Sequence, residues 1–438
     1  MSRLCNVRRR ISDDLVKTRQ NKPSLAASST LVAIGRGYLY ERLVIVQRII
    51  GIAAFILVAL SIVVGAHHYV WARLVRDVGF SPPLRRALSF VIVGLGLSVP
   101  ASFILSRQLP PNHGRWLLYV MYTWMGTLLI AVVALSVADL VRWLLESALA
   151  ERLQFAVHPE RRLFMRRILA AAATLATGAS TAIAIKEALA EVKVKDVRVP
   201  LSRLPASMHG FTIVQISDLH LGPTLRTEFT YRIVTQVNAL NADLIAITGD
   251  LVDGTVDRLR EMVAPLRDLR ARHGTYFVTG NHEYYSGVDD WISEIRRLGI
   301  TVLRNERVSI GSPDASFDLV GIDDAHAHQF GNGHGADLPR ATRDRDARRE
   351  AILLAHQPRA VFDARQHGIG LQLSGHTHGG QIWPFTWLVR LQQPVVKGLA
   401  KIGSVWVYVN SGTGYWGPPM RLAVPAEITR VTLQSEQV

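Results

Sequence analysis

The stretch Leu373–Pro384, LSGHTHGGQIWP, places His376 and His378 two residues apart between glycines, at the end of an apolar run. In an extended segment, residues i and i+2 project to the same side, so both imidazoles can face one point. The glycines allow tight turns and close approach of the backbone to a ligand. This spacing indicates a metal site, although a lone H-x-H pair also occurs in ordinary surface loops.

Four further polar clusters precede this one, and each follows a short apolar run. They are Asp218-x-His220, Gly249-Asp250, Gly280-Asn281-His282-Glu283 and His356. Asp or Asn after a strand is an ordinary turn residue, so each cluster alone has a structural explanation. Five such clusters in succession favour one shared metal-binding site.

The elements that carry these clusters begin at about Val194. GFTIVQISD, DLIAITGD, TYFVTGNHE, AILLAHQP and GLQLSGHTH resemble strands that end on the polar residues. Between them, the segments from Glu228 and from Val256 have apolar residues at the three- and four-residue spacing of helices. This alternation predicts an α/β domain with largely parallel strands, whose loops gather at the strand ends.

Together the five clusters resemble the calcineurin-like metallophosphoesterase superfamily, whose pattern is D-x-H, G-D, G-N-H-E/D, H and G-H-x-H. Residues 194–438 carry every element of this pattern without substitution. GHTHGGQ, GNHEYY and ILLAHQP are most similar to a bacterial membrane-associated branch that includes UDP-2,3-diacylglucosamine hydrolases. The resemblance implies a two-sheet sandwich flanked by helices, with a two-metal centre on its loops. It does not extend to the residues before 194.

The resemblance also implies a ligand role for each cluster. Asp250 would bridge two divalent cations, because the two oxygens of a carboxylate can bind both. The other ligands would be Asp218, His220 and His378 for the first cation, and Asn281, His356 and His376 for the second. Such nitrogen and oxygen ligands suit Mn, Fe, Zn or Co without selecting among them.

Catalysis would follow from the same arrangement. A hydroxide held between the cations would attack phosphorus in line, while the metals neutralise the phosphoryl oxygens. His282 would contact the phosphate and protonate the leaving oxygen. Glu283, Asp253 and Asp323 are candidates for orienting the ligands, or are ordinary turn carboxylates. Arg421 could meet a substrate phosphate or lie on the surface.

The first 193 residues have a different character. Three uncharged runs, 49–66, 87–106 and 116–138, come close to the roughly 20 residues that cross a bilayer, and the alanine-rich run 168–185 is a weaker fourth. The alternative is a set of buried helices in a soluble core. We expect a basic segment at 1–48, an all-α membrane region at 49–187 with about four transmembrane helices, and the metallophosphoesterase domain at 194–438.

The net charge of +15 is concentrated in the N-terminal part. Residues 1–193 hold 24 Lys and Arg against 10 Asp and Glu, whereas residues 194–438 hold 26 against 25. A near-neutral C-terminal half argues against nucleic acid as a partner. The single cysteine, Cys5, excludes an intramolecular disulfide and a zinc cage built from cysteines.

Arginines around the fourth apolar run indicate the orientation. Arg161, Arg162, Arg166 and Arg167 precede it, and they would stay in the cytoplasm whether the run is an internal twin-arginine signal or a plain helix. We therefore expect an integral protein of the cell (inner) membrane, with its catalytic domain on the extracytoplasmic side. The basic N-terminus argues against this, because four spans would carry it to the same side.

These observations predict a membrane-anchored phosphohydrolase that cleaves a phosphoester or pyrophosphate bond. Its partners would be the lipid bilayer and a phosphorylated small-molecule or lipid substrate. One alternative is a nuclease or protein phosphatase of the same superfamily, which the neutral charge and the tether disfavour. The other is a non-catalytic, metal-stabilised membrane accessory protein, which the complete ligand set disfavours. Residues 325–349 are expected to overhang the site.

Overall fold

The computed structural model of the 438-residue chain describes residues 46, 50–51, 53–109, 114–153, 159–331 and 333–437. By compactness the chain divides into Met1–Gly65 and Ala66–Val438. Apart from residue 46, the predicted basic segment 1–48 lies outside the described residues, as does Cys5. The predicted limits of the three regions stay predictions.

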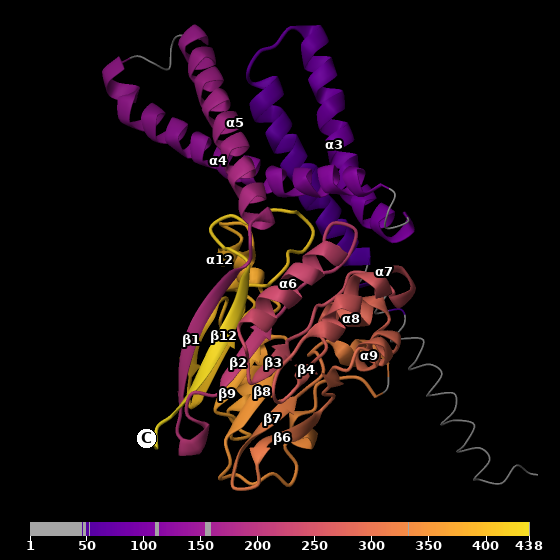
Figure 1. Cartoon of the computed structure of the whole chain (residues 1–438). Coiled ribbons are helices and arrows are strands. Elements are labelled where there is room, and N and C mark those ends of the chain that lie inside the picture. Colours follow the sequence, from indigo (N-terminus) through magenta and orange to yellow (C-terminus); the bar gives the residue numbers. More distant parts are fainter. Residues whose placement is uncertain are drawn as a thin grey trace, which may run out of the picture. The chain divides into compact units, whose positions relative to one another are not determined.

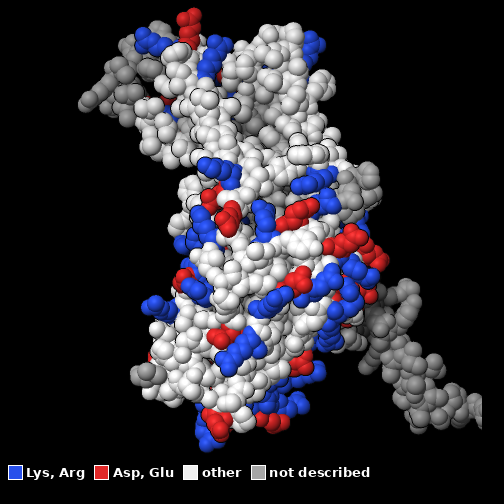
Figure 2. Space-filling model, in the orientation of Figure 1, with Lys and Arg blue, Asp and Glu red and all other residues white. Residues whose placement is uncertain are grey.

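Four long apolar helices occupy the described part of the N-terminal region. They are Ala53–Arg76, α3 (Pro82–Gln108), α4 (Arg115–Leu153) and α5 (Pro159–Leu189). Each contains a stretch long and apolar enough to cross a membrane, and only 11–22% of the residues in these stretches are buried within the protein. Figure 2 shows the helices with mostly uncharged surface, while Lys, Arg, Asp and Glu gather over the rest of the chain. The four predicted apolar helices are thus confirmed, and their low burial is consistent with a helical membrane region.

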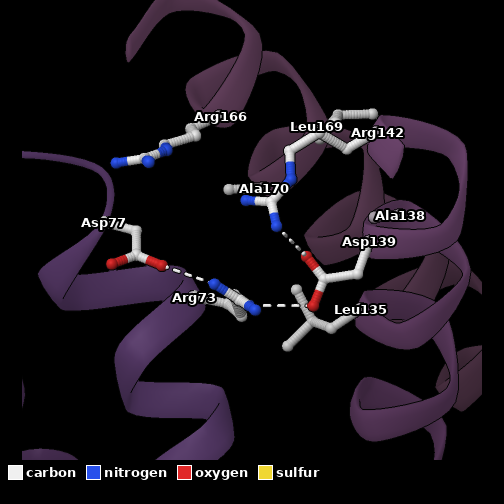
Figure 3. A pocket seen from close by; sticks show the side chains of 9 residues that line it. All are labelled: Arg73, Asp77, Leu135, Ala138, Asp139, Arg142, Arg166, Leu169 and Ala170. Atoms are coloured by element: carbon white, nitrogen blue, oxygen red, sulfur yellow. Dashed lines mark hydrogen bonds and ion pairs between the residues drawn. The ribbon is translucent and has the colours of Figure 1, made fainter. Parts of the chain in front are cut away.

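One group of charged residues lies between these helices and is paired internally. Arg73 contacts Asp77 at 2.8 Å and Asp139 of α4 at 2.9 Å, and the Tyr69 hydroxyl donates to Asp139 at 2.7 Å. Figure 3 shows Arg73, Asp77 and Asp139 beside a cavity of about 30 Å³. That volume is enough for a water molecule and too small for a substrate. Pairing lowers the cost of placing these charges among apolar helices.

The remainder of the chain forms two six-stranded mixed sheets (Figure 1). The first has the order β1-β12-β2-β3-β4-β5, formed by Lys193–Leu201, Glu427–Ser435, Thr212–Ile216, Leu244–Ile247, Thr275–Phe277 and Thr301–Val302. The second has the order β10-β11-β9-β8-β7-β6, formed by Gly398–Ile402, Val405–Val409, Leu371–Ser374, Ala351–Leu354, Ala315–Gly321 and Glu306–Ser312. Strands β2 to β5 are parallel, and so are β7, β8, β9 and β11.

The apolar residues of these strands define the layers. Strands of both sheets share one buried cluster that includes Leu244, Phe317 and Leu371, so the two sheets pack face to face. The outer face of the first sheet is covered by α6 (Thr227–Ala239), α7 (Val256–Val263) and α9 (Val288–Arg297). The outer face of the second is covered by α10 (Leu338–Ala341) and α11 (Val361–Ala364). The predicted two-sheet sandwich flanked by helices is confirmed.

Candidate metal centre

The predicted ligands all follow the carboxyl ends of parallel strands. Asp218 follows β2, Asp250 follows β3, and Asn281 follows β4 at the start of α8 (Asn281–Ser286). In the second sheet, His356 follows β8, and His376 and His378 follow β9. Because parallel strands end at the same edge, the two sheets deliver side chains to one place. We call the seven predicted ligands the ligand cluster: Asp218, His220, Asp250, Asn281, His356, His376 and His378.

The backbone at the ligand cluster is held in unusual conformations. Asp218, His220, Asp250, His376 and His378 all have φ between 47° and 70°, in the left-handed region that non-glycine residues rarely adopt. Each such residue costs about 1–3 kcal/mol and persists only where its surroundings enforce it. This clustering of backbone strain indicates a functional site.

Two glycines of the motifs are required by close packing. A Cβ at position 280 would collide with the Asp250 carboxylate, and a Cβ at position 375 would collide with the side chains of Ser217 and Asp218. Because these glycines have no Cβ, the loop after β4 can pack against the loop after β3, and the loop after β9 can pack against the loop after β2.

The first predicted ligand group comes together as expected. Ligand atoms of Asp218, His220 and His378 lie within 4.8 Å of one another, and all three residues are buried. The Nε2 atoms of His220 and His378 are 3.0 Å apart, and His378 Nε2 is 3.5 Å from Asp218 Oδ1. These atoms converge on one point, as ligands of a single cation must.

The second group forms beside the first, and Asp250 faces both. Ligand atoms of Asp250, His356 and His376 also lie within 4.8 Å of one another. Oδ2 of Asp250 lies 3.2 Å from His356 Nε2 and 3.7 Å from His220 Nε2, so one carboxylate oxygen faces both groups. Asn281 is buried, and its Oδ1 atom has no hydrogen-bond partner among the described residues. This geometry fits the bridging role predicted for Asp250.

Hydrogen bonds fix which ring nitrogen each histidine presents. His356 Nδ1 lies 2.7 Å from the carbonyl oxygen of Thr248, to which it can only donate, so Nε2 is the nitrogen left to face a metal. His220 Nδ1 lies 2.9 Å from Asp253 Oδ1, which likewise leaves Nε2 for a metal. Asp253 thus orients His220, which is the first of the two alternatives considered for this carboxylate.

Glu283 holds the ligand loops through their backbones. Its buried carboxylate accepts hydrogen bonds from the N–H groups of Asp250, Leu251 and Gly280, at 2.7–3.0 Å. Each N–H left without a partner in this interior would cost about 1–3 kcal/mol. Glu283 therefore joins the loop after β3 to the loop after β4.

Burial keeps two of the histidines neutral. It lowers the pKa of His376 to about 3, and positive charge on His356 acts in the same direction. Burial and the neighbouring His220 also hold the pKa of His378 well below its usual value. Neutral imidazoles have the free lone pair that a metal ion requires.

Positive charge around Asp250 keeps its buried carboxylate ionised. Burial raises the pKa of Asp250, but the charges of His356 and His282 outweigh this effect and hold it well below its usual range. Burial lowers the pKa of His356, and Asp250 and Asp218 reverse this effect and raise it well above its usual value. A proton on His356 therefore supplies charge that a cation could supply instead. The donor set, its convergence and the unpartnered Asn281 oxygen together fit two divalent cations.

His282 lies at the mouth of the ligand cluster. Its Nδ1 is 2.6 Å from Asp253 Oδ1, and its Nε2 is 4.0 Å from Asp250 Oδ2. Its ring contacts those of Tyr285 and Trp416, with centroids 5.4 and 5.8 Å apart. His282 thus presents Nε2 beside the cation positions, within an aromatic rim.

Two sequence interpretations need correction. Arg421 is completely buried and neither meets a phosphate nor lies on the surface: its guanidinium donates to carbonyl oxygens of Ser411, Gly412, Gly414 and Val424. It therefore shapes the loop after β11.

Asp323 pairs with Arg304 at 2.6 Å rather than with a metal ligand. The adjacent Asp324 points to Gln357, whose Nε2 donates to it at 2.9 Å. Arg304 lies outside every motif, so the sequence contained no signal for this pairing.

The rim residues Tyr285 and Trp416 were also missed, although Tyr285 lies within the quoted GNHEYY. Residues 325–349 do reach the site, because Phe330 contacts Tyr285 with ring centroids 5.6 Å apart.

Comparison with known proteins places this geometry in context. The family model for calcineurin-like phosphoesterases matches residues 211–380. A protein of Danio rerio named transmembrane protein with metallophosphoesterase domain is 35% identical over 393 residues, covering 87% of this chain and 89% of that protein. A protein of the same name from Bos taurus is 35% identical over 439 residues, covering 94% of this chain and 97% of that protein.

A bacterial relative matches a shorter part. An uncharacterized metallophosphoesterase of Helicobacter pylori strain J99 is 39% identical over 249 residues, covering 56% of this chain and 65% of that protein. The alignment with the Danio rerio protein covers 393 residues, which is more than the length of residues 194–438. It therefore includes part of the helical region.

Proposed function

Because this chain belongs to the calcineurin-like metallophosphoesterase family and is a metal-dependent phosphoesterase with membrane helices, we propose that it hydrolyses a phosphoester or pyrophosphate bond of a lipid-linked substrate at the membrane surface. The observation that carries the proposal is Oδ2 of Asp250, which faces His220 and His356 at once. A carboxylate in that position can hold two cations close enough to act on one phosphoryl group.

The residues would divide the work as follows. When bound, the two cations would acidify a water molecule and neutralise charge on the phosphoryl oxygens. Asp218, His220 and His378 would hold one cation, Asn281, His356 and His376 the other, and Asp250 both. His282 would donate a proton from Nε2 to the leaving oxygen, since Asp253 accepts at its Nδ1. Metal identity is open among Mn, Fe, Zn and Co.

Two features support a lipid-linked substrate. The chain has four helices long and apolar enough to cross a membrane, and two of them pack against Ile382 and Met420 of the catalytic domain. The rim contains Tyr285, Phe330 and Trp416, which are 56%, 41% and 44% exposed and are uncharged. An aromatic rim suits an apolar leaving group better than a polyanionic one such as nucleic acid, whose recognition depends on Lys and Arg.

We expect hydrolysis to depend entirely on divalent metal. Chelation of the purified full-length protein in detergent should abolish hydrolysis of a panel of phosphomonoesters, phosphodiesters and pyrophosphates. Addition of Mn²⁺ or a similar ion should restore it, because the ligand cluster loses its cations under chelation. Metal analysis of the same samples is the control. Full activity in protein shown to be metal-free would contradict the proposal, and the panel would identify the bond that is cleaved.

We also propose that the catalytic domain lies on the extracytoplasmic side of the cell membrane. Arg258 of this domain donates to the carbonyl oxygens of Arg107 and Leu109, which end α3. The C-terminal end of α3 is therefore on the side of the domain. The opposite ends of the helices carry most of the arginines, namely Arg73, Arg76, Arg85, Arg86, Arg142, Arg161, Arg162, Arg166 and Arg167. Arginine-rich ends are retained in the cytoplasm, which supports this orientation.

Cysteine labelling in intact cells tests the orientation. In a Cys5→Ser background, a membrane-impermeant maleimide should label Val194→Cys and Gln108→Cys and should leave Ser81→Cys unlabelled. All three sites should react after the cells are permeabilised, which controls for accessibility. Labelling of Ser81→Cys alone in intact cells would reverse the orientation and favour an intracellular lipid intermediate as substrate.

A further inference from the structure

An exposed group of apolar side chains follows directly after the GHTHGG motif. Phe385, Trp383, Leu388, Trp387 and Leu391 are 45%, 50%, 55%, 59% and 82% exposed. They lie on and around the short helix α12 (Thr386–Val389), and we call them the aromatic patch. Such a concentration of exposed large apolar residues marks an interaction surface.

The patch is continuous with the membrane helices. Ile382, the residue before it, is buried in one cluster with Ile130 of α4, Ala184 of α5 and Met420. The backbone N–H of Arg421 donates to the carbonyl oxygen of Ala184 at 2.8 Å. Ala184 is at the end of the apolar run of α5, where a spanning helix reaches the bilayer surface. In Figure 1, α12 lies at the end of the domain that α5 meets.

Composition favours a bilayer as the occupant of this surface. No Asp or Glu occurs from His376 to Ala426, whereas Arg390 and Lys397 fall within or just after the patch. The Arg390 guanidinium lies over the Trp387 ring, 4.5 Å from its centroid. Tryptophan beside basic residues is typical of the headgroup region, where the ring sits between lipid and water and the cation meets lipid phosphate.

The patch is joined to the rim of the metal centre. Gln381 precedes it, and the Gln381 side chain donates to the Trp416 carbonyl oxygen and accepts from the Trp416 N–H, each at 3.0 Å. The Trp416 ring contacts His282. A headgroup held at the patch would therefore lie beside the mouth of the ligand cluster.

We propose that the aromatic patch docks into the headgroup region of the adjacent leaflet and lets a membrane-resident phosphoester enter the metal centre directly from the bilayer. The docking surface stands by itself, whereas the entry of a phosphoester rests on the proposed function. The two parts are therefore tested separately.

Fluorescence quenching tests the docking. Leu391→Cys in a Cys5→Ser background is labelled with an environment-sensitive fluorophore, and the full chain is reconstituted in vesicles of phosphatidylcholine and phosphatidylglycerol. Lipids brominated near the headgroup should remove most of the emission at position 391. The matched control is Ser404→Cys, an exposed site in the turn before β11, at the other end of that strand from the ligand cluster. Its emission should not change.

Two results would overturn the docking surface. Emission typical of water at position 391 without quenching would mean that the patch stays in solution. Emission typical of an apolar environment without quenching would mean that a second copy of the chain covers it.

A patch variant tests the entry route. Trp383→Ser, Trp387→Ser and Leu391→Ser combined should lower hydrolysis of phosphatidic acid in vesicles at least about tenfold, because three apolar side chains are withdrawn from lipid. Hydrolysis of water-soluble p-nitrophenyl phosphate should not change. An equal loss on both substrates would show that the patch supports the site structurally and would contradict lipid entry. Absence of all hydrolysis in the unmodified protein would refute the proposed function while leaving the quenching result valid.

Discussion

Asp250→Asn is expected to abolish phosphoester hydrolysis, with a loss on the order of 10³-fold or more, since the cations together supply several kcal/mol of transition-state stabilisation. The reason is geometric. Oδ2 of Asp250 faces His356 Nε2 at 3.2 Å and His220 Nε2 at 3.7 Å, so the position serves both ligand groups. An amide is neutral and offers a weaker oxygen, so both cations should be lost together.

Metal analysis beside kinetics checks this expectation. The matched control is Asp196→Asn, an exposed aspartate of β1 that pairs with Arg430, and it should keep its metal and its activity. Far-UV circular dichroism should show that Asp250→Asn remains folded. Retention of both metals by Asp250→Asn would mean that this residue does not bridge them.

The sequence predicted much of the site because its signals are local. Each ligand follows a short apolar run, and side chains at the ends of parallel strands must converge. The structure places Asp218, Asp250 and His356 at such ends. Apolar runs do not specify which sheet a strand joins, since β3 and β8 are both short buried aliphatic segments. That choice depends on pairings distant in sequence, such as the insertion of β12, the last strand, between β1 and β2.

Backbone groups account for much of what the sequence did not reveal. The carbonyl oxygen of Thr248 fixes the ring of His356, and any residue type has such an oxygen. Arg421 was misjudged for a related reason: all three of its guanidinium nitrogens donate to main-chain carbonyl oxygens, which any residue type has. An arginine in this position could be expected to contact a phosphate. Arg421 is completely buried, however, so it cannot reach a substrate.

Contacts between the membrane helices and the catalytic domain were also beyond the sequence. Gly126 of α4 lies against Pro418, Met420 and Ile382, where a Cβ would crowd all three side chains. Each hydrophobic run predicts a helix that can span a bilayer. Neither the length of the run nor its charge predicts which loop of the catalytic domain packs against that helix.

His282→Ala is expected to keep both metals and still lose about 10²–10⁴-fold in rate, the usual contribution of a general acid. His282 Nδ1 lies 2.6 Å from Asp253, and its Nε2 is left to face the reacting group. Burial lowers its pKa, but Asp250 and Asp253 outweigh this effect and raise it to about 9, so the ring is protonated at neutral pH. Bound cations oppose that rise. Activity should therefore fall as pH rises through a value at or below about 9. This decrease should be absent from the pH profile of His282→Ala.

The leaving group distinguishes proton donation from a purely structural role. A nitrophenolate leaves without a proton, whereas an alkoxide needs one, so His282→Ala should lose far more rate on an alkyl phosphate than on p-nitrophenyl phosphate. The matched control, His209→Ala, removes an exposed histidine outside the ligand cluster and should change neither rate nor metal content. Equal losses on both esters would assign His282 to phosphate binding rather than to proton donation. Loss of metal from His282→Ala would instead make it a ligand, and its Nε2, 4.0 Å from Asp250 Oδ2, would have to move toward a cation.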